Sequence, residues 1–188
     1  FSMRRIYLVR HCKATGQEPD AALTEEGVIQ ARKLADFFAD REIELIVSSP
    51  YERAISTIRP FAERYAKAVV TDDRLRERVL SAENLPDWQD KLEQSFIDLD
   101  ARLPGGESSK EAMDRGISVV YELLDRPERN IIAVTHGNLL SLILKHFDDS
   151  FGFEEWKGMT NPDIYELRKP DDAGKVMVKR IWQSKERQ

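Results

Sequence analysis

The sequence contains a single cysteine, Cys12, among its 188 residues. An internal disulfide needs two cysteines and a cysteine-rich zinc site needs several, so the sequence excludes both. It also has no apolar run approaching the about 18 residues that span a membrane. Its first residues lack the basic and then apolar order of a secretory signal. We therefore expect no membrane association, and we expect the protein to work in the cytoplasm.

Positive charge is in the minority along the chain. Lysine and arginine together number 29 against 34 aspartate and glutamate residues, which gives a net charge of -5 and an isoelectric point of about 5.4. A chain with this charge has no general affinity for nucleic acid or for anionic membranes. Any positively charged binding site must therefore be local.

The length and composition indicate one globular domain. Hydrophobic residues make up 41% of the chain and the mean hydropathy is -0.52, and we find no internal repeat, low-complexity tract or long linker. Phe1 and Ser2 before Met3 resemble a cloning remnant, so we place the domain at residues 3–188. Nothing in the sequence indicates the oligomeric state.

Apolar, β-branched runs alternate with amphipathic segments of helical period, and this alternation is typical of an α/β protein. We predict a three-layer sandwich in which a mostly parallel central sheet has helices on both faces. Two of the strands should form a closing pair, joined by a hairpin turn at Asp171–Gly174. The expected strands are Ile6–Val9, Leu45–Val47, Ala68–Val70, Ile131–Val134, Asp163–Leu167 and Val176–Trp182.

Three polar residues mark the expected starts of helices. Thr24 precedes two glutamates, Ser49 precedes a proline suited to the first helical position, and Ser108 forms a capping box with the glutamate three residues later. Pro60 should kink or shorten the second of these helices. The segment from Arg74 to Gly106 is the least regular and resembles a cap, with a helix expected at Trp88–Leu99.

Two of the three histidines follow predicted strands. His11 comes after the first strand, and His136 comes after the strand that ends at Thr135. Because ligands of open α/β sheets bind beyond the carboxyl ends of the strands, these two side chains are expected to share one pocket. Arg10 adjoins His11, and Arg53 lies in the first turn of the helix after the second strand, whose free N–H groups favour an anion.

Two arginines, two histidines and a helix start are suited to a dianionic phosphoryl group. A guanidinium matches phosphate oxygens bidentately, and a neutral imidazole is a competent nucleophile toward phosphorus. Fixed cations stabilise the negative charge that develops on the transferred group. The guanidinium groups supply these cations, so we expect neither a metal nor a cofactor.

Four blocks of the sequence resemble, in order, the motifs of the histidine phosphatase superfamily, branch 1, whose members share a phosphoglycerate mutase-like fold. A single Arg-His pair would be weak evidence, but four ordered blocks are specific. The resemblance extends from about Ile6 to the strand near Ile164. The blocks are Leu8-Val9-Arg10-His11-Cys12, Leu23–Ala31, Ser48–Thr57 and Thr135-His136-Gly137.

The resemblance implies a metal-independent phosphatase that hydrolyses a small phosphomonoester. His11 would carry the phosphoryl group as a phosphohistidine and release it to water. Arg10, Arg53 and His136 would hold the transferred group.

Other residues of the chain match less specific parts of the family pattern. Glu77, in Leu75-Arg76-Glu77, is similar to the acidic proton donor of family members, and Glu107 is the second candidate for that role. A solvated patch of charges among the neighbouring arginines is the alternative reading of Glu77. Gln17, Glu107 and Gly137 are the residues expected to contact substrate.

Two departures from the family pattern affect the predicted function. Cys12 occupies a position where the family usually has glycine, and Lys13 replaces an acid. The loop from Lys13 to Ala22 also lacks the segments typical of phosphoglycerate mutases, which favours hydrolysis over phosphoryl transfer between hydroxyls. A mutase, a protein phosphatase and a non-catalytic phosphate-binding protein remain alternatives. The sequence does not identify the substrate.

Overall fold

The computed structural model describes residues 3–172 and 174–184. Within them, six strands form one sheet in the order β3-β2-β4-β1-β5-β6. The first four strands along the chain run parallel, whereas β5 and β6 are antiparallel additions at one edge. The strands are β1 (Met3–Arg10), β2 (Leu45–Ser48), β3 (Val70–Thr71), β4 (Asn130–Thr135), β5 (Asp163–Pro170) and β6 (Met177–Gln183).

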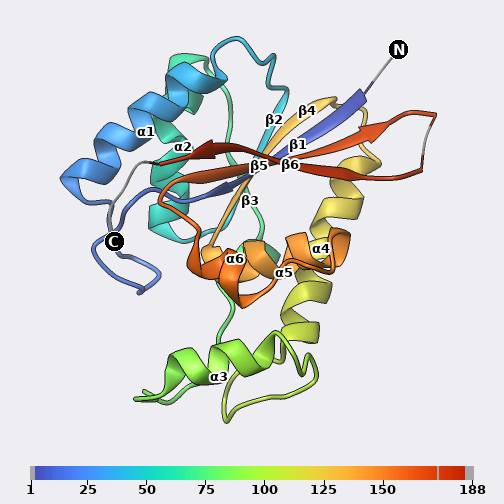
Figure 1. Ribbon diagram of the computed structural model, residues 1–188. Helices are drawn as coiled ribbons and strands as arrows, with labels where there is room; N and C mark the ends of the chain where they lie inside the picture. Colours follow the sequence, from blue (N-terminus) through green and yellow to red (C-terminus); the bar gives the residue numbers. More distant parts are fainter. Residues whose placement is uncertain (1–2, 173, 185–188) are drawn as a thin grey trace.

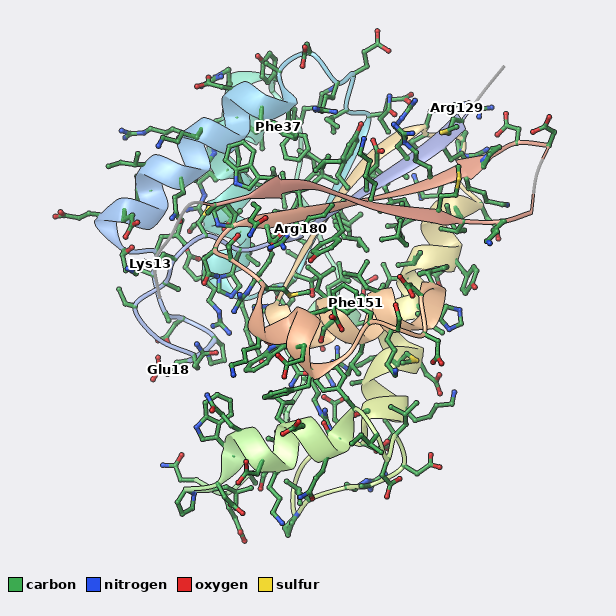
Figure 2. The ribbon with its side chains drawn as sticks, in the orientation of Figure 1. Lys13, Glu18, Phe37, Arg129, Phe151 and Arg180 are labelled. Atoms are coloured by element: carbon green, nitrogen blue, oxygen red, sulfur yellow. The ribbon has the colours of Figure 1, made fainter. Side chains whose placement is uncertain are left out.

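Helices cover both faces of this sheet, as the sequence predicts (Figure 1). The alternation of side chains along β1 shows why: Ile6 and Leu8 belong to one buried cluster, and Tyr7 and Val9 belong to the other. The first cluster contains α4 (Ser109–Leu124) and α5 (Gly137–Phe147), and the second contains α1 (Glu25–Phe38) and α2 (Glu52–Arg64). Phe37 and Phe151 lie on opposite sides of the sheet (Figure 2). The predicted three-layer α/β sandwich is therefore confirmed.

The caps of two helices follow the sequence. Thr24 accepts a hydrogen bond from the Gly27 N–H at the start of α1. Ser108 and Glu111 form the predicted reciprocal capping box of α4, with bonds of 3.0 and 2.9 Å. Local chemistry at these two sites therefore decides where each helix begins.

The prediction for α2 is wrong at its start. The helix begins at Glu52 with Tyr51 as its N-cap, and Ser49 is still paired with the sheet through its N–H, which donates to the Val134 carbonyl. The Ser49 hydroxyl accepts from the Tyr51 N–H, so a turn separates the strand from the helix. Of the two effects predicted for Pro60, a kink or a shortening, the shortening does not occur, because α2 continues to Arg64.

The remaining differences lie where periodicity is weak. The third strand is Val70–Thr71 instead of Ala68–Val70, because Val70 and Thr71 are in register with β2. The segment that follows contains a 3-10 turn (η1, Asp73–Leu75) and α3 (Trp88–Ser95), which ends before the predicted Leu99. A short α6 (Phe153–Lys157) precedes β5.

Some predictions concern residues outside the described ranges. Ala173, within the predicted hairpin turn, and the proposed remnant Phe1-Ser2 lie outside them. Among the described residues, no helix combines the length and the apolar character needed to cross a membrane.

Candidate active site

The ends of β1 and β4 bring the two histidines together. These strands are parallel neighbours with Arg10 opposite Thr135, so the next residue of each strand emerges at the same edge. The His11 N–H still donates to the Thr135 carbonyl at 3.2 Å. The two imidazole rings are consequently 5.1 Å apart between centroids.

His11 is held in a defined tautomer. Its Nδ1 lies 2.7 Å from the Cys12 carbonyl, and because a carbonyl can only accept, Nδ1 must carry the hydrogen. The Nε2 lone pair is then available, and the Arg53 Nε–H donates to it at 3.3 Å. Burial lowers the pKa of His11 to about 3, against an opposing contribution from the Cys12 carbonyl. The ring is therefore neutral at physiological pH, with its lone pair toward the guanidinium.

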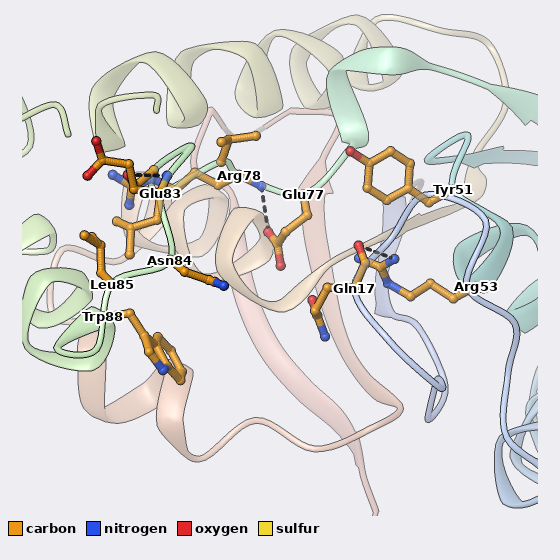
Figure 3. A pocket seen from close by; sticks show the side chains of 12 residues that line it. Gln17, Tyr51, Arg53, Glu77, Arg78, Glu83, Asn84, Leu85 and Trp88 are labelled. Carbon is orange, nitrogen blue, oxygen red and sulfur yellow. Dashed lines mark hydrogen bonds between the residues drawn. The ribbon is translucent and has the colours of Figure 1, made fainter. Parts of the chain in front are cut away.

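Arg53 lies in the first turn of α2 and is almost completely buried, with 1% of its surface exposed. Its guanidinium also donates to the carbonyls of Gln17 and Glu18, at 3.1 and 2.9 Å. The ring of Tyr51 lies 5.1 Å from its central carbon. These contacts hold the guanidinium in place while its Nε–H faces His11. Figure 3 shows the Arg53 side chain beside Gln17 and Tyr51.

Arg10 packs against the start of α5. A Cβ at Gly137 would lie 2.8 to 3.0 Å from three atoms of the Arg10 guanidinium, so only glycine leaves this side chain its present position. The guanidinium contacts the Thr160 carbonyl at 3.4 Å. Next to it, the Asn161 amide donates to the His11 carbonyl at 2.9 Å. The loop before β5 therefore supports both Arg10 and His11.

His136 is fully buried and contacts one polar group and an aromatic ring. Its Nε2 lies 2.8 Å from the Ser49 hydroxyl, and Tyr51 contacts it edge-on with ring centroids 5.1 Å apart. Within the described part of the chain, Nδ1 has no hydrogen-bond partner. Burial lowers the pKa of His136 well below its usual value, and electrostatic interactions with His11 and Arg53 lower it further.

Glu77 lies on the loop after η1, and its carboxylate is at the start of α5, the helix that follows His136. It accepts from the backbone N–H groups of Asn138 and Leu139 at 3.2 and 2.9 Å, and from that of Arg78 at 2.8 Å. Free N–H groups at a helix start are natural partners for a carboxylate. The carboxylate points into the cavity that also contains Arg53 and Gln17 (Figure 3).

Glu107, the second candidate acid, has a different setting. Both of its oxygens pair with Arg115, at 2.8 and 2.9 Å, and one also accepts from the Val79 N–H. Burial raises the pKa of Glu107, but the bonds from Arg115 and Val79 outweigh this effect and lower it. Arg115 in turn donates to the Glu77 carbonyl. Glu107 does not line the cavity and is part of the support behind Glu77.

The cavity that contains Arg53 and Glu77 has a volume of about 440 Å³, and His11 and His136 are not among the residues that line it. A second hollow of about 260 Å³ adjoins Arg10. Among the described residues, no group of three or more histidine, cysteine or acidic side chains is placed to hold a metal ion. The first cavity is lined by Gln17, Tyr51, Arg53, Glu77, Arg78, Val79, Leu80, Ser81, Glu83, Asn84, Leu85 and Trp88. The second is lined by Arg10, Gln89, Trp156, Lys157, Met159, Thr160 and Asn161.

The two departures from the family pattern lie away from the cavity. Cys12 is fully buried in the core with α1 and α2, and its N–H donates to the Thr57 hydroxyl at 2.8 Å. Among described non-glycine residues, positive φ occurs at Glu42 and Ala66, so a cysteine causes no backbone strain at position 12. Lys13 pairs with Glu26 at 3.1 Å and is exposed on the loop after β1 (Figure 2).

Sequence reasoning missed three residues of the site. Ser49 and Tyr51 lie inside the third motif block and contact His136, yet we expected a helix cap at Ser49. Asn161 contacts the His11 backbone across 150 positions of sequence, and no local pattern indicates this.

Solved structures share this arrangement of strands and helices. A mycobacterial glucosyl-3-phosphoglycerate phosphatase in complex with inorganic phosphate matches with a TM-score of 0.75 and 27% identity, covering 96% of this chain and 97% of that one. A phosphoglycerate mutase from Bacillus anthracis matches with a TM-score of 0.74 over 96% of this chain and 93% of that one, but at 17% identity it supports the fold alone. The fold is therefore phosphoglycerate mutase-like, as the sequence predicts.

Sequence comparison identifies the family. Residues 6–179 match the histidine phosphatase superfamily (branch 1). A glucosyl-3-phosphoglycerate phosphatase from Mycobacterium tuberculosis is 33% identical over 170 residues, which is 74% of this chain and 73% of that protein. The chain belongs to the histidine phosphatase superfamily (branch 1), and its relatives support the predicted phosphomonoesterase activity.

Proposed function

We propose that this protein hydrolyses a phosphomonoester of a small molecule through a phosphohistidine formed on His11. The observation that carries the proposal is the neutral His11 ring, whose Nε2 lone pair meets the Arg53 Nε–H at 3.3 Å. A nucleophilic nitrogen beside a guanidinium is the pairing that phosphoryl transfer requires. Arg10 and His136 complete the surroundings of the transferred group.

In the first step, the Nε2 lone pair of His11 attacks phosphorus. The bond from phosphorus to the leaving oxygen breaks, and that oxygen takes a proton from the acid form of Glu77. The guanidinium groups of Arg10 and Arg53 balance the negative charge on the phosphoryl oxygens. The Cys12 carbonyl, which accepts from Nδ1–H, stabilises the positive charge that the imidazole acquires.

In the second step, water attacks the phosphohistidine. Glu77, now a carboxylate, takes a proton from the water, the nitrogen–phosphorus bond breaks, and its electron pair returns to Nε2. Inorganic phosphate leaves and both residues regain their starting states. The two guanidinium groups supply the cations for this reaction, so it needs no metal ion.

The proposal is tested by phosphate release from p-nitrophenyl phosphate in the presence of EDTA. The unmodified protein should turn over the substrate, and His11→Asn should lower the rate by at least about a thousandfold. His146→Asn is the matched control, because His146 is an exposed histidine on α5 that contacts Tyr121 instead of the cavity. Activity that depends on an added metal ion, or full activity in His11→Asn, would contradict the mechanism.

Water, and not a second alcohol, is the proposed phosphoryl acceptor. The phosphatase relatives support this choice, and so does the loop of residues 13–22, which lacks the segments of the mutases. Incubation with 3-phosphoglycerate and its bisphosphate primer should yield no 2-phosphoglycerate. Rapid interconversion of the two isomers would favour the mutase alternative.

A further inference from the structure

The far half of the cavity beyond Glu77 is formed by one continuous segment, residues 79–88. Its lining side chains combine an apolar part, Leu85 and Trp88, with the polar groups of Glu83 and Asn84. Figure 3 shows Glu77 in the middle, with Arg53 and Gln17 on one side and these residues on the other. The cavity thus has a phosphoryl end and a second end of different chemistry.

The segment that forms the second end carries negative charge and no positive charge. Residues 79–88 include Glu83, which lines the cavity, and Asp87, and they include neither lysine nor arginine. The cavity is lined by two cationic residues, Arg53 and Arg78. Arg53 is engaged at the phosphoryl end with His11 and two carbonyls.

Arg78 is also engaged elsewhere. It is 5% exposed, and its guanidinium donates to the hydroxyls of Ser95 and Ser109 and to the Glu107 carbonyl, at 3.0 to 3.1 Å. These partners hold the charge inside the packing of α3 against α4. Arg78 is thus a buried cation whose two Nη groups already have partners, and its Nε, which has no partner among the described residues, is buried as well.

The position of Glu77 determines which way the alcohol part of the substrate extends. If Glu77 protonates the leaving oxygen, that oxygen lies beside Glu77, and the rest of the alcohol occupies the space toward Glu83 and Trp88. An apolar face of the alcohol would pack on the Trp88 ring, which is 44% exposed. Hydrogen-bond donors at its far end would meet Glu83 and the Asn84 amide.

We propose that the substrate is a phosphomonoester whose alcohol carries an amine or other hydrogen-bond donors and no carboxylate, with Glu83 as the residue that selects against anionic alcohols. This proposal rests on the function proposed above, because it requires Glu77 to face the leaving oxygen. A carboxylate would lose its hydration at this end, where the buried Arg78 guanidinium is already bonded to its neighbours, and it would be repelled by Glu83. An ammonium or hydroxyl group would gain an acceptor instead.

The second hollow is the alternative location for the alcohol. It contains the cationic Arg10 and Lys157, so it would favour an anionic alcohol. Glu77 does not line it, and the Trp88 and Trp156 rings, in edge-on contact at 6.2 Å, lie between the two spaces. The two locations therefore predict opposite charge preferences.

Two probes of equal length distinguish them: phosphoethanolamine, which ends in an ammonium group, and phosphoglycolate, which ends in a carboxylate. Each is measured as a competitor of p-nitrophenyl phosphate turnover, so that an inhibition constant is obtained even for a poor substrate. Phosphoethanolamine should bind about tenfold more tightly or better. Glu83→Gln should reduce the ratio of the two inhibition constants roughly two- to fivefold, which is the range for an exposed charge. Glu83→Lys should reduce this ratio further.

Glu93→Gln is the matched control, because Glu93 is an exposed glutamate on α3 that does not line the cavity; its ratio should equal that of the unmodified protein. Equal binding of the two probes, or tighter binding of phosphoglycolate, would overturn the proposal. A preference for phosphoglycolate that Lys157→Met abolishes would assign the alcohol to the second hollow. Loss of p-nitrophenyl phosphate turnover in His11→Asn reports separately on the proposed function.

Discussion

At the residue scale, the two histidines differ in what fixes them. The Cys12 carbonyl determines the tautomer of His11, whereas the Ser49 hydroxyl and the Tyr51 ring position His136. The proposed nucleophile is thus held by the backbone of its own loop. The second histidine is held by the turn that precedes α2.

Glu77 and Glu107 can be separated by the leaving group. Glu77→Gln should lower kcat about 10²- to 10⁴-fold for alkyl phosphates, because their alkoxide needs a proton to leave. The loss should be much smaller for p-nitrophenyl phosphate, whose phenolate leaves unprotonated. Steady-state kinetics on the two substrates measures this difference.

Glu107→Gln is the control for that experiment. It removes the partner of Arg115 and should lower the free energy of unfolding by about 1–3 kcal/mol. It should show no dependence on the leaving group. If Glu107→Gln reproduced the leaving-group dependence and Glu77→Gln did not, the assignment of the acid would be reversed.

Gly137 tests the position of Arg10. In Gly137→Ala the new methyl group must displace the guanidinium, which is the flexible end of a side chain, so folding should be nearly unaffected. Phosphate should bind more weakly, by about 1–3 kcal/mol for a displaced charged hydrogen-bonding group. Calorimetric titration with inorganic phosphate and a thermal melt measure the two quantities. Unchanged phosphate affinity would show that Arg10 does not contact the anion.

At the element scale, β6 supports the site from a distance. Arg180 on β6 donates to both carboxylate oxygens of Asp163, which is fully buried at the start of β5 (Figure 2). Asp163 also accepts from the Thr160 N–H at 2.9 Å. The Thr160 carbonyl then contacts Arg10, and the adjacent Asn161 holds the His11 carbonyl. The antiparallel edge of the sheet thereby positions the loop beside the phosphoryl pocket.

Arg180→Met should weaken both folding and the site. Removing the guanidinium leaves the buried Asp163 carboxylate without its cation, which should cost about 2–4 kcal/mol of unfolding free energy. Asp163→Asn combined with Arg180→Met should recover part of that loss, because no charge is then left buried. Urea denaturation of the single and double variants measures this coupling. Additive effects of the two substitutions would contradict it.

At the scale of the whole molecule, much of the fold was predictable because its strands are buried and β-branched. Ile131–Val134 and Ile6–Val9 lie in the centre of the sheet, where burial on both faces leaves a continuous apolar run. The convergence of His11 and His136 follows from parallel strands that end at one edge. The chemical roles of these residues stay predictions until they are tested.

Other features depend on contacts between distant parts of the chain. Two of the N–H groups that bind Glu77 come from α5, some 61 positions later, so sequence alone left Glu77 and Glu107 as rivals. The segment of residues 74–106 has little periodicity, because it packs as a cap through individual side chains such as Arg78. Serine is a residue type that often caps helices, but the Ser49 hydroxyl contacts His136 instead.

The buried histidines make stability depend on pH. Burial lowers the pKa of both His11, to about 3, and His136, so between that value and 6.5 the unfolded chain binds protons that the folded protein excludes. Unfolding free energy should therefore fall as the pH falls through this range. His11→Asn removes one such site. As the pH falls from 7 to about 5, the unfolding free energy of this variant minus that of the unmodified protein should rise by about 2 kcal/mol. Parallel curves of stability against pH for the two proteins would show that His11 titrates normally.

The most direct test of the central claim is to trap the phosphorylated enzyme. The protein is mixed with a phosphomonoester that it turns over, quenched within milliseconds in alkali, which preserves phosphohistidine, digested and analysed by mass spectrometry. We predict one added HPO₃ group on the peptide that contains His11, and none in His11→Asn. A phosphoryl group on another residue, or turnover of the same substrate with no phosphorylated peptide at any time, would contradict the account.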